Sequence, residues 1–196
     1  MDAQGSRPDA DLIGESLSRP DAFAAIFERH FAAVHRYLAR RAGAGLADDL
    51  ASEVFTVAFA RRASFRGHSD SALPWLLGIA TNLLHNHGRA ERSAWNLAAR
   101  LRASWTEEQP DIAERAAVRD ERGGRAGDVA AGLAALSAEQ REVVLLFAWA
   151  ELSYEEIAEA LAIPLGTVRS RLARARVQLR AGLVAAATGA AREENR

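Results

Sequence analysis

A run of arginine side chains near the C-terminus is the feature of the sequence best suited to binding another molecule. Residues 161–192 hold six arginines and no carboxylate. Guanidinium groups bond bidentately to guanine in a DNA major groove, and serine or threonine reaches base edges and phosphates. We call the candidate contacts on this helix the arginine face: Thr167, Arg169, Ser170, Arg171, Ala173, Arg174 and Arg176. We expect the arginine face to read paired DNA; the simpler alternative is a solvated arginine surface.

Two predicted helices position this face. Ser153 and Glu156 have the spacing of a capping box, and apolar residues follow at i, i+3, i+4 and i+7. Pro164 then marks a turn. A second apolar stripe comes after the turn at helical spacing, formed by Val168, Leu172, Ala175, Leu179 and Leu183. The pattern predicts a helix-turn-helix, whose second helix enters the major groove of DNA.

The charges separate into two kinds of surface. The chain has a net charge of -1, yet residues 137–160 hold six glutamates and a single arginine, Arg141. The glutamate-rich segment thus precedes an arginine-rich segment. This distribution is typical of a protein that contacts DNA at defined places and another protein elsewhere, rather than one that coats nucleic acid.

A second polar surface lies on a helix predicted over residues 73–92, with leucine and alanine on its opposite side. We call it the polar strip: Trp75, Asn82, His85, Asn86, Arg89 and Arg92. Phe65 and Arg66 in the preceding loop add an aromatic ring beside a guanidinium group. Such side chains stack on an unpaired base and hold its phosphates, which suits single-stranded or flipped-out DNA. The alternative is a surface helix whose tryptophan packs on a neighbour. Gly88 is a candidate end of this helix.

An acidic segment offers a third candidate surface. Its residues are Asp48, Asp49, Leu50, Glu53, Val54 and Phe55, and we call its three carboxylates the acidic edge. Carboxylates in the first turn of a helix interact favourably with the helix dipole, which is one explanation. The other explanation is a docking site for a basic partner, in which Leu50, Val54 or Phe55 is partly exposed among the acids.

The sequence argues against several other functions. It has no cysteine, which excludes disulfides and thiolate zinc sites. His85, Asn86 and His87 are adjacent on one helix and diverge too far to chelate one ion, so we predict no metal site. No general base with an orienting partner and no glycine-rich phosphate loop is evident, so we predict no catalytic site and no cofactor. No apolar run approaches the ~20 residues of a membrane span, and the polar N-terminus lacks a secretion signal. We expect a cytoplasmic protein without membrane insertion.

Apolar spacing predicts an all-α fold with two small helical domains joined by a long flexible linker. Stripes over residues 23–38 and 46–59 predict two helices, and a third spans 73–87. Ser137 and Gln140 form another capping box, which starts the second domain. The linker is longer than the ~15 residues that compact domains usually tolerate in a connection. The expected parts are a flexible N-terminus (1–20), a first domain (21–93), a linker (94–132), a helix-turn-helix domain (133–184) and a tail (185–196).

Taken together, these segments resemble the extracytoplasmic-function (ECF) sigma factors of the bacterial sigma-70 family. FAAIFERHFAAVHRYL and DDLASEVFTVAFARRASFRG are similar to the first helices of region 2, and PWLLGIATNLLHNHGR to its helix that melts DNA and reads the minus-ten element. Residues 136–176 are similar to region 4, which reads the minus-thirty-five element. Region-4-like helices also occur in response regulators, but both motifs in this order are specific.

The resemblance implies a promoter-specificity subunit that is not an enzyme and that binds core RNA polymerase and promoter DNA. It implies minus-thirty-five contacts at the arginine face and polymerase contacts at the acidic segment. The implied minus-ten contacts are Phe65, Arg66, Trp75, Asn82, Asn86 and Arg89, with Asn82 at a pocket for a flipped base. It also implies an anti-sigma factor as a partner. The alternative function is a stand-alone helix-turn-helix regulator, which binds duplex DNA without polymerase.

Two positions depart from the family pattern. Ala162 occupies a turn position where glycine is common, and a left-handed conformation there costs ~1 kcal/mol for alanine. Ala173 is smaller than the bulky residue of some relatives, so its contact with a base is expected to be slight.

Overall fold

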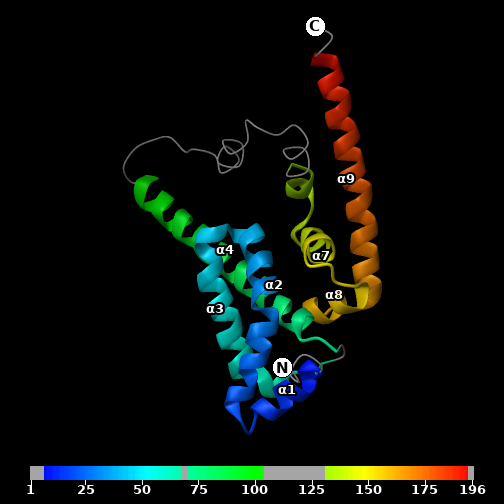
Figure 1. The fold of residues 1–196 in the computed structure, drawn as a ribbon. Helices are drawn as coiled ribbons and strands as arrows, with labels where there is room; N and C mark the ends of the chain where they lie inside the picture. The colour runs from blue at the N-terminus through cyan, green and yellow to red at the C-terminus, as the bar shows by residue number, and fades with distance from the viewer. Residues whose placement is uncertain (1–6, 68–69, 104–130, 194–196) are drawn as a thin grey trace. The chain divides into compact units, whose positions relative to one another are not determined.

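The computed structural model describes residues 7–67, 70–103 and 131–193 (Figure 1), and over 89–103 and 183–193 it describes the backbone alone. Every regular element within these ranges is helical. The prediction of an all-α fold is therefore confirmed. No helix in the described ranges has the length and apolar character needed to cross a membrane.

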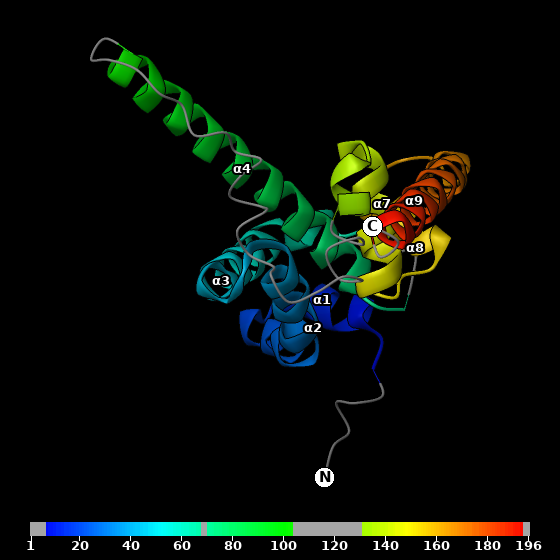
Figure 2. The ribbon, with the colours of Figure 1, turned by 90° about the horizontal axis from the view of Figure 1, so that it is seen from above.

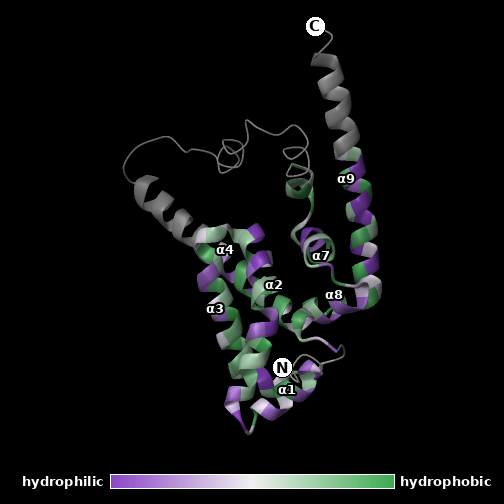
Figure 3. Cartoon of the chain, viewed as in Figure 1, coloured by the Kyte–Doolittle hydropathy of each residue, from purple (hydrophilic) through white to green (hydrophobic). Residues whose placement is uncertain are grey.

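Two antiparallel helices form the centre of the N-terminal part. Helix α2 (Ala24–Ala42) and helix α3 (Ala44–Arg61) lie side by side (Figure 1 and Figure 2). Gly43 joins them at a φ of 85°, a conformation that glycine adopts without a steric penalty. The predicted stripes supply their buried residues, among them Ile26, Val34, Leu38, Leu50, Val54 and Ala58. Hydrophilic and hydrophobic segments alternate along both helices (Figure 3), as expected for amphipathic helices.

The prediction of a flexible N-terminus is wrong for the residues that the structure describes. Helix α1 (Asp9–Ser16) and the short helix η2 (Pro20–Phe23) precede α2, and Leu12 and Ile13 of α1 are both 2% exposed. Pro8 and Pro20 suggested a loose segment. Pro8 instead occupies the N-cap of α1 and Pro20 the first position of η2, where the missing amide hydrogen of proline is no disadvantage. Residues 1–6 lie outside the described ranges.

Helix α4 (Leu73–Ala103) is longer than predicted. Its apolar side is as expected, since Leu76, Leu77 and Ala80 are buried. Gly88 does not end the helix, because a single glycine inside a helix costs only ~1 kcal/mol. The helix therefore continues into the predicted linker as far as residue 103. The rest of that linker, over residues 104–130, lies outside the described ranges.

The C-terminal part contains a helical segment over residues 131–135, then α7 (Ala138–Trp149), α8 (Tyr154–Leu161) and α9 (Leu165–Glu193). Helix α9 extends through most of the predicted tail. Both predicted capping boxes are present. The Ser137 amide donates to Gln140 Oε1 at 3.0 Å, and the Gln140 amide donates to Ser137 Oγ at 3.3 Å. The Ser153 amide donates to Glu156 Oε2 at 2.8 Å, and the Glu156 amide to Ser153 Oγ at 3.2 Å.

Arg141, the single arginine of the glutamate-rich segment, supports the start of this part. Its guanidinium group donates to the carbonyl oxygens of Leu133, Ala134 and Leu136 at 2.7, 2.9 and 3.0 Å. The last carbonyls of a helix have no partner within the helix, and a cation there interacts favourably with the negative end of the helix dipole. Arg141 therefore stabilises the end of the 131–135 segment.

Candidate nucleic-acid interface

The turn before α9 sets the direction of the arginine face. Ala162 has φ 51° and ψ 45°, so the expected left-handed conformation is present. The Ala162 amide donates to the Glu159 carbonyl at 3.2 Å, and the Ile163 amide donates to the Ala158 carbonyl at 3.0 Å. Bonds of this kind close the end of α8. The Pro164 carbonyl then accepts from the amides of Thr167 and Val168, at 2.8 and 3.3 Å, which begins α9.

The first turns of α9 present arginine opposite a buried apolar stripe. Val168, Leu172 and Ala175 of the predicted stripe are buried. Four members of the arginine face are exposed, namely Arg169, Ala173, Arg174 and Arg176, and three are half-buried, namely Thr167, Ser170 and Arg171. At 100° per residue, Ser170, Ala173 and Arg174 point away from the stripe, and the other arginines flank them. Since residues 165–182 include five arginines and no carboxylate, this surface suits an anion.

The polar strip is exposed along α4, with one aromatic contact at its start. Asn82, His85 and Asn86 are exposed, and Trp75 is half-buried. The rings of Phe65 and Trp75 lie 5.1 Å apart between centroids. Trp75 therefore packs on a neighbour, as the simpler alternative requires, while a part of both rings stays accessible. A spacing of seven residues from Trp75 to Asn82, and of four from Asn82 to Asn86, places them along one side of α4.

The structure describes the guanidinium groups near this strip only in part. Arg66 is exposed, and its side chain lies 3.5 Å from the carbonyl oxygens of Ala63 and Phe65. Arg89 and Arg92 fall on the described backbone of α4, but their side chains lie outside the described residues. Within the described ranges, no group of three or more acidic, histidine or cysteine side chains is arranged to hold a metal ion.

The acidic segment divides into an exposed part and a buried part. Asp48, Asp49 and Glu53 are exposed. The expected partial exposure of the apolar residues is wrong, because Leu50, Val54 and Phe55 are buried. The Phe55 ring packs on Phe27 and Phe31, with centroid distances of 4.8 and 6.2 Å. Within the acidic segment, the acidic edge is therefore the part available to a partner.

The helix dipole accounts poorly for the acidic edge. Helix α3 begins at Ala44, so none of the three carboxylates lies in its first turn, where the dipole acts. Asp48 Oδ1 lies within hydrogen-bond distance of His35 Nε2, at 2.9 Å, although the Asp48 side chain remains 82% exposed. Phe27 and Phe59, which the sequence places in apolar stripes, are 41% and 37% exposed. Exposed rings and exposed carboxylates on the same pair of helices, α2 and α3, favour a docking surface.

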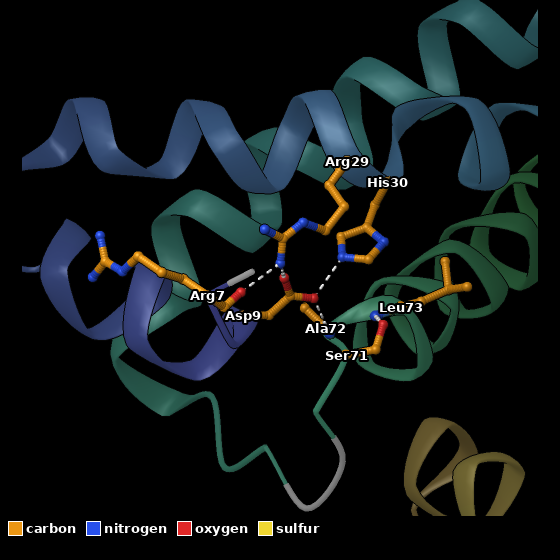
Figure 4. A network of polar contacts seen from close by, with 7 residues as sticks. All are labelled: Arg7, Asp9, Arg29, His30, Ser71, Ala72 and Leu73. Carbon is orange, nitrogen blue, oxygen red and sulfur yellow. Dashed lines mark hydrogen bonds and ion pairs between the residues drawn. The ribbon is translucent and has the colours of Figure 1, made fainter. Parts of the chain in front are cut away.

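A buried polar network, which the sequence analysis missed, connects α1, α2 and the start of α4 (Figure 4). Asp9 is 1% exposed. Its Oδ2 atom lies 2.6 Å from His30 Nε2 and accepts the Ala72 amide at 2.6 Å, and its Oδ1 atom forms an ion pair with Arg29. Arg29 also donates to the Arg7 carbonyl at 3.0 Å.

The surroundings of Asp9 favour its ionised form. Burial raises the pKa of the Asp9 carboxyl, but the hydrogen bonds from His30 and the Ala72 amide, with the charges of His30 and Arg29, outweigh it. The pKa of Asp9 therefore lies below its ordinary value. An aspartate in a polar N-terminal segment usually indicates a surface, so only its neighbours Leu12 and Ile13 could have signalled this site.

Comparison with known proteins assigns a family to these surfaces. The models for sigma-70 region 2 and for sigma-70 region 4 match residues 26–94 and 127–179. The ECF RNA polymerase sigma factor SigC of Mycobacterium tuberculosis is 35% identical over 143 residues, which cover 73% of this chain and 73% of that protein. The RNA polymerase sigma factor YlaC of Bacillus subtilis is 30% identical over 168 residues, which cover 84% of this chain and 93% of that protein.

Solved structures agree on the fold. The structure of CnrH in complex with the cytosolic domain of CnrY has a TM-score of 0.61 at 24% identity and covers 91% of this chain and 98% of that chain. The sigma factor RpoE in complex with the anti-sigma factor NepR, from Bartonella quintana, has a TM-score of 0.54 at 24% identity and covers 83% and 97%. The region 2 model covers the helix of the polar strip, and the region 4 model covers the helices of the arginine face. The chain therefore belongs to the sigma-70 family and is an ECF sigma factor.

Proposed function

We propose that this sigma factor binds core RNA polymerase and directs transcription to promoters that it selects through two elements. The arginine face reads the minus-thirty-five element as duplex DNA, and the polar strip with Phe65 and Arg66 reads the minus-ten element as an opened strand. The observation that carries this proposal is the pair of exposed surfaces of different chemistry. Guanidinium groups line α9, and exposed amides follow the Phe65–Trp75 ring pair along α4.

Readout of the minus-thirty-five element follows from the way α9 is held. The buried stripe turns Ser170, Ala173 and Arg174 outward, where a groove of DNA reaches them. Arg174 then contacts base edges, with guanine as its preferred partner. Arg169 and Arg176 flank this line and contact phosphates, which set the register of the helix. The small Ala173 side chain allows α9 to approach the DNA closely but contributes little to discrimination between bases.

Readout of the minus-ten element requires a base that has left the duplex. Flipping a base costs a few kcal/mol in unstacking and unpairing. Stacking on an aromatic side chain contributes ~1–3 kcal/mol per base, enough to offset much of this. The partly accessible rings of Phe65 and Trp75 offer such a surface, and the exposed amides of Asn82 and Asn86 bond to base edges. Capture of the base assists melting of the promoter.

Two protein partners complete the proposal. Core polymerase contacts the acidic edge, Asp48, Asp49 and Glu53, through a basic surface of its own. Leu50, Val54 and Phe55 support these carboxylates from inside the domain rather than touching polymerase. An anti-sigma factor is the second partner, by analogy with the solved complex of RpoE with NepR.

Reconstitution with sigma-free core polymerase tests this function. The full chain is added to core enzyme on fragmented genomic DNA, and the start sites of the transcripts are mapped. We expect a set of starts that core enzyme alone does not produce and that share two upstream elements. The stand-alone regulator predicts the opposite result, namely binding of duplex DNA by the chain alone and no new start sites. That result would refute the proposal.

A further inference from the structure

We propose that α1 is a brace for the loop that precedes α4, and that Asp9 is a positioning residue for minus-ten readout. The inference rests on the proposed function. This loop lies between η3 (Arg62–Ser64) and α4, its described residues are 65–67 and 70–71, and it carries Phe65 and Arg66. One helix of eight residues is bonded to the chain on both sides of this loop.

The first bond lies after the loop, at the start of α4. The Ala72 carbonyl accepts the Leu76 amide, so Ala72 is the residue at which the bonding of the helix begins. Its own amide has no partner within the helix and donates to Asp9 Oδ2 at 2.6 Å. Ser71 Oγ accepts the next amide, that of Leu73, at 3.2 Å (Figure 4). A carboxylate from α1 thus caps α4 and places a negative charge at the positive end of its dipole.

The second bond lies before the loop. Arg62 Nε donates to the carbonyl of Ser16, the last residue of α1, at 3.3 Å. The Phe65 amide donates to the Arg62 carbonyl at 3.2 Å, which connects that bond to the first residue of the loop. The Asp9 amide adds a bond to the Asp70 carbonyl at 3.4 Å. The two ends of α1 therefore hold the two ends of the loop.

This arrangement determines where the stacking surface forms. Phe65 begins the loop, and Trp75 lies in the first turn of α4, so the 5.1 Å between their rings depends on the spacing of the two ends. Asn82 follows two turns later on the same helix, and its position depends on how α4 begins. Loss of the Asp9 carboxylate leaves the Ala72 amide, His30 and Arg29 without their charged acceptor in a buried site. We therefore expect the start of α4 to loosen.

The test compares Asp9→Asn with Asp11→Asn, since both residues are acids of α1 but Asp11 is exposed. Each full-length variant is assembled with core polymerase on promoters with single changes in either element. We expect Asp9→Asn to reduce discrimination at the minus-ten element by about 2- to 30-fold, the range of effects that travel through contact networks. Discrimination at the minus-thirty-five element should be unchanged, and Asp11→Asn should match the wild type.

Hydrogen exchange of the chain without polymerase separates this inference from the proposed function. Amides over residues 62–67 and 70–76 should exchange faster in Asp9→Asn than in the wild type, with no change in Asp11→Asn. If the wild type directs no transcription, the proposed function fails while the exchange result still tests the brace. Unchanged exchange in Asp9→Asn, or equal loss at both promoter elements, would overturn the inference. If Asp9→Asn does not fold, Arg62→Met keeps an apolar stem over Phe59 but removes the donors to the Ser16 and Phe59 carbonyls, with the same expected results.

Discussion

Replacing Ala162 with glycine is expected to stabilise the helix-turn-helix. At φ 51° and ψ 45°, an L-residue loses about 1–2 kcal/mol relative to the right-handed region, and glycine does not. Ordering glycine on folding in turn costs about 0.4–1 kcal/mol more than ordering alanine, because the unfolded glycine backbone is more flexible. Because Ala162 is exposed, its methyl group contributes little packing. The relief of the left-handed strain outweighs the entropic cost of glycine, so we expect a rise of about 0.5–1 kcal/mol in the free energy of unfolding.

The matched control is Ala181→Gly, the same substitution at an exposed position well inside α9. There the backbone is right-handed, so glycine should lower the free energy of unfolding by about 0.5–1 kcal/mol. Both variants are unfolded in urea as full-length chains, and Trp149 fluorescence is followed after the other three tryptophans are replaced by phenylalanine. Opposite signs for the two substitutions are expected. A lower stability of Ala162→Gly than of its parent would show that the turn is not left-handed.

Four further predictions concern the surfaces and the buried carboxylate. Arg174→Ala should weaken discrimination at the minus-thirty-five element by about 1–3 kcal/mol, measured by transcription from promoters with single changes. Asn82→Ala should slow promoter opening, measured by permanganate reactivity of thymines near the start site. Asp48→Asn combined with Glu53→Gln should weaken binding to core polymerase, with a smaller difference at high salt, measured by fluorescence anisotropy. Asp9→Asn should lower the free energy of unfolding at pH 7, and this difference should shrink as the pH falls through the depressed pKa of Asp9, measured by urea unfolding from pH 7 to pH 3.

The sign of the pH effect follows from the direction of the pKa shift. The folded state holds the Asp9 carboxyl ionised at pH values where the unfolded chain already binds a proton. The stabilisation is therefore complete above the unfolded pKa and is lost as the pH falls through the folded pKa. A stability difference between wild type and Asp9→Asn that grows on acidification would contradict this assignment.

For the DNA contacts, Arg180→Ala serves as a control, since Arg180 is exposed on α9 beyond the arginine face.

The features that the sequence predicted well are local. Ser153 and Glu156 lie three residues apart, as do Ser137 and Gln140, so a capping box can be recognised within one turn. The apolar stripe of α9 repeats within a few turns, which orients the arginine face without knowledge of the rest of the fold. The conformation of Ala162 follows from its place between two such helices. These predictions needed no contact between distant segments.

The predictions that failed depended on distant contacts or on element boundaries. A polar N-terminal segment shows no sign that the Asp9 carboxylate meets an amide 63 residues later. The acidic edge was assigned to a first turn, but α3 begins at Ala44, several residues earlier. Gly88 was considered as a helix end, although helix boundaries are the least certain part of such predictions. Burial of Leu50 and Val54 against α2 likewise becomes visible only once two helices are paired.

The bond between Asp9 and the Ala72 amide also has a consequence for synthesis of the chain on the ribosome. Residues 9–16 are synthesised well before residue 72, so Asp9 can meet Arg29 and His30 early but lacks the Ala72 amide until 63 more residues have been added. During that interval α1 can contact η2 and α2, but not η3 or the start of α4. Closing so long a loop carries an entropic cost before any contact compensates for it. We expect α1 to dock completely only after η3 and the first turn of α4 have been synthesised.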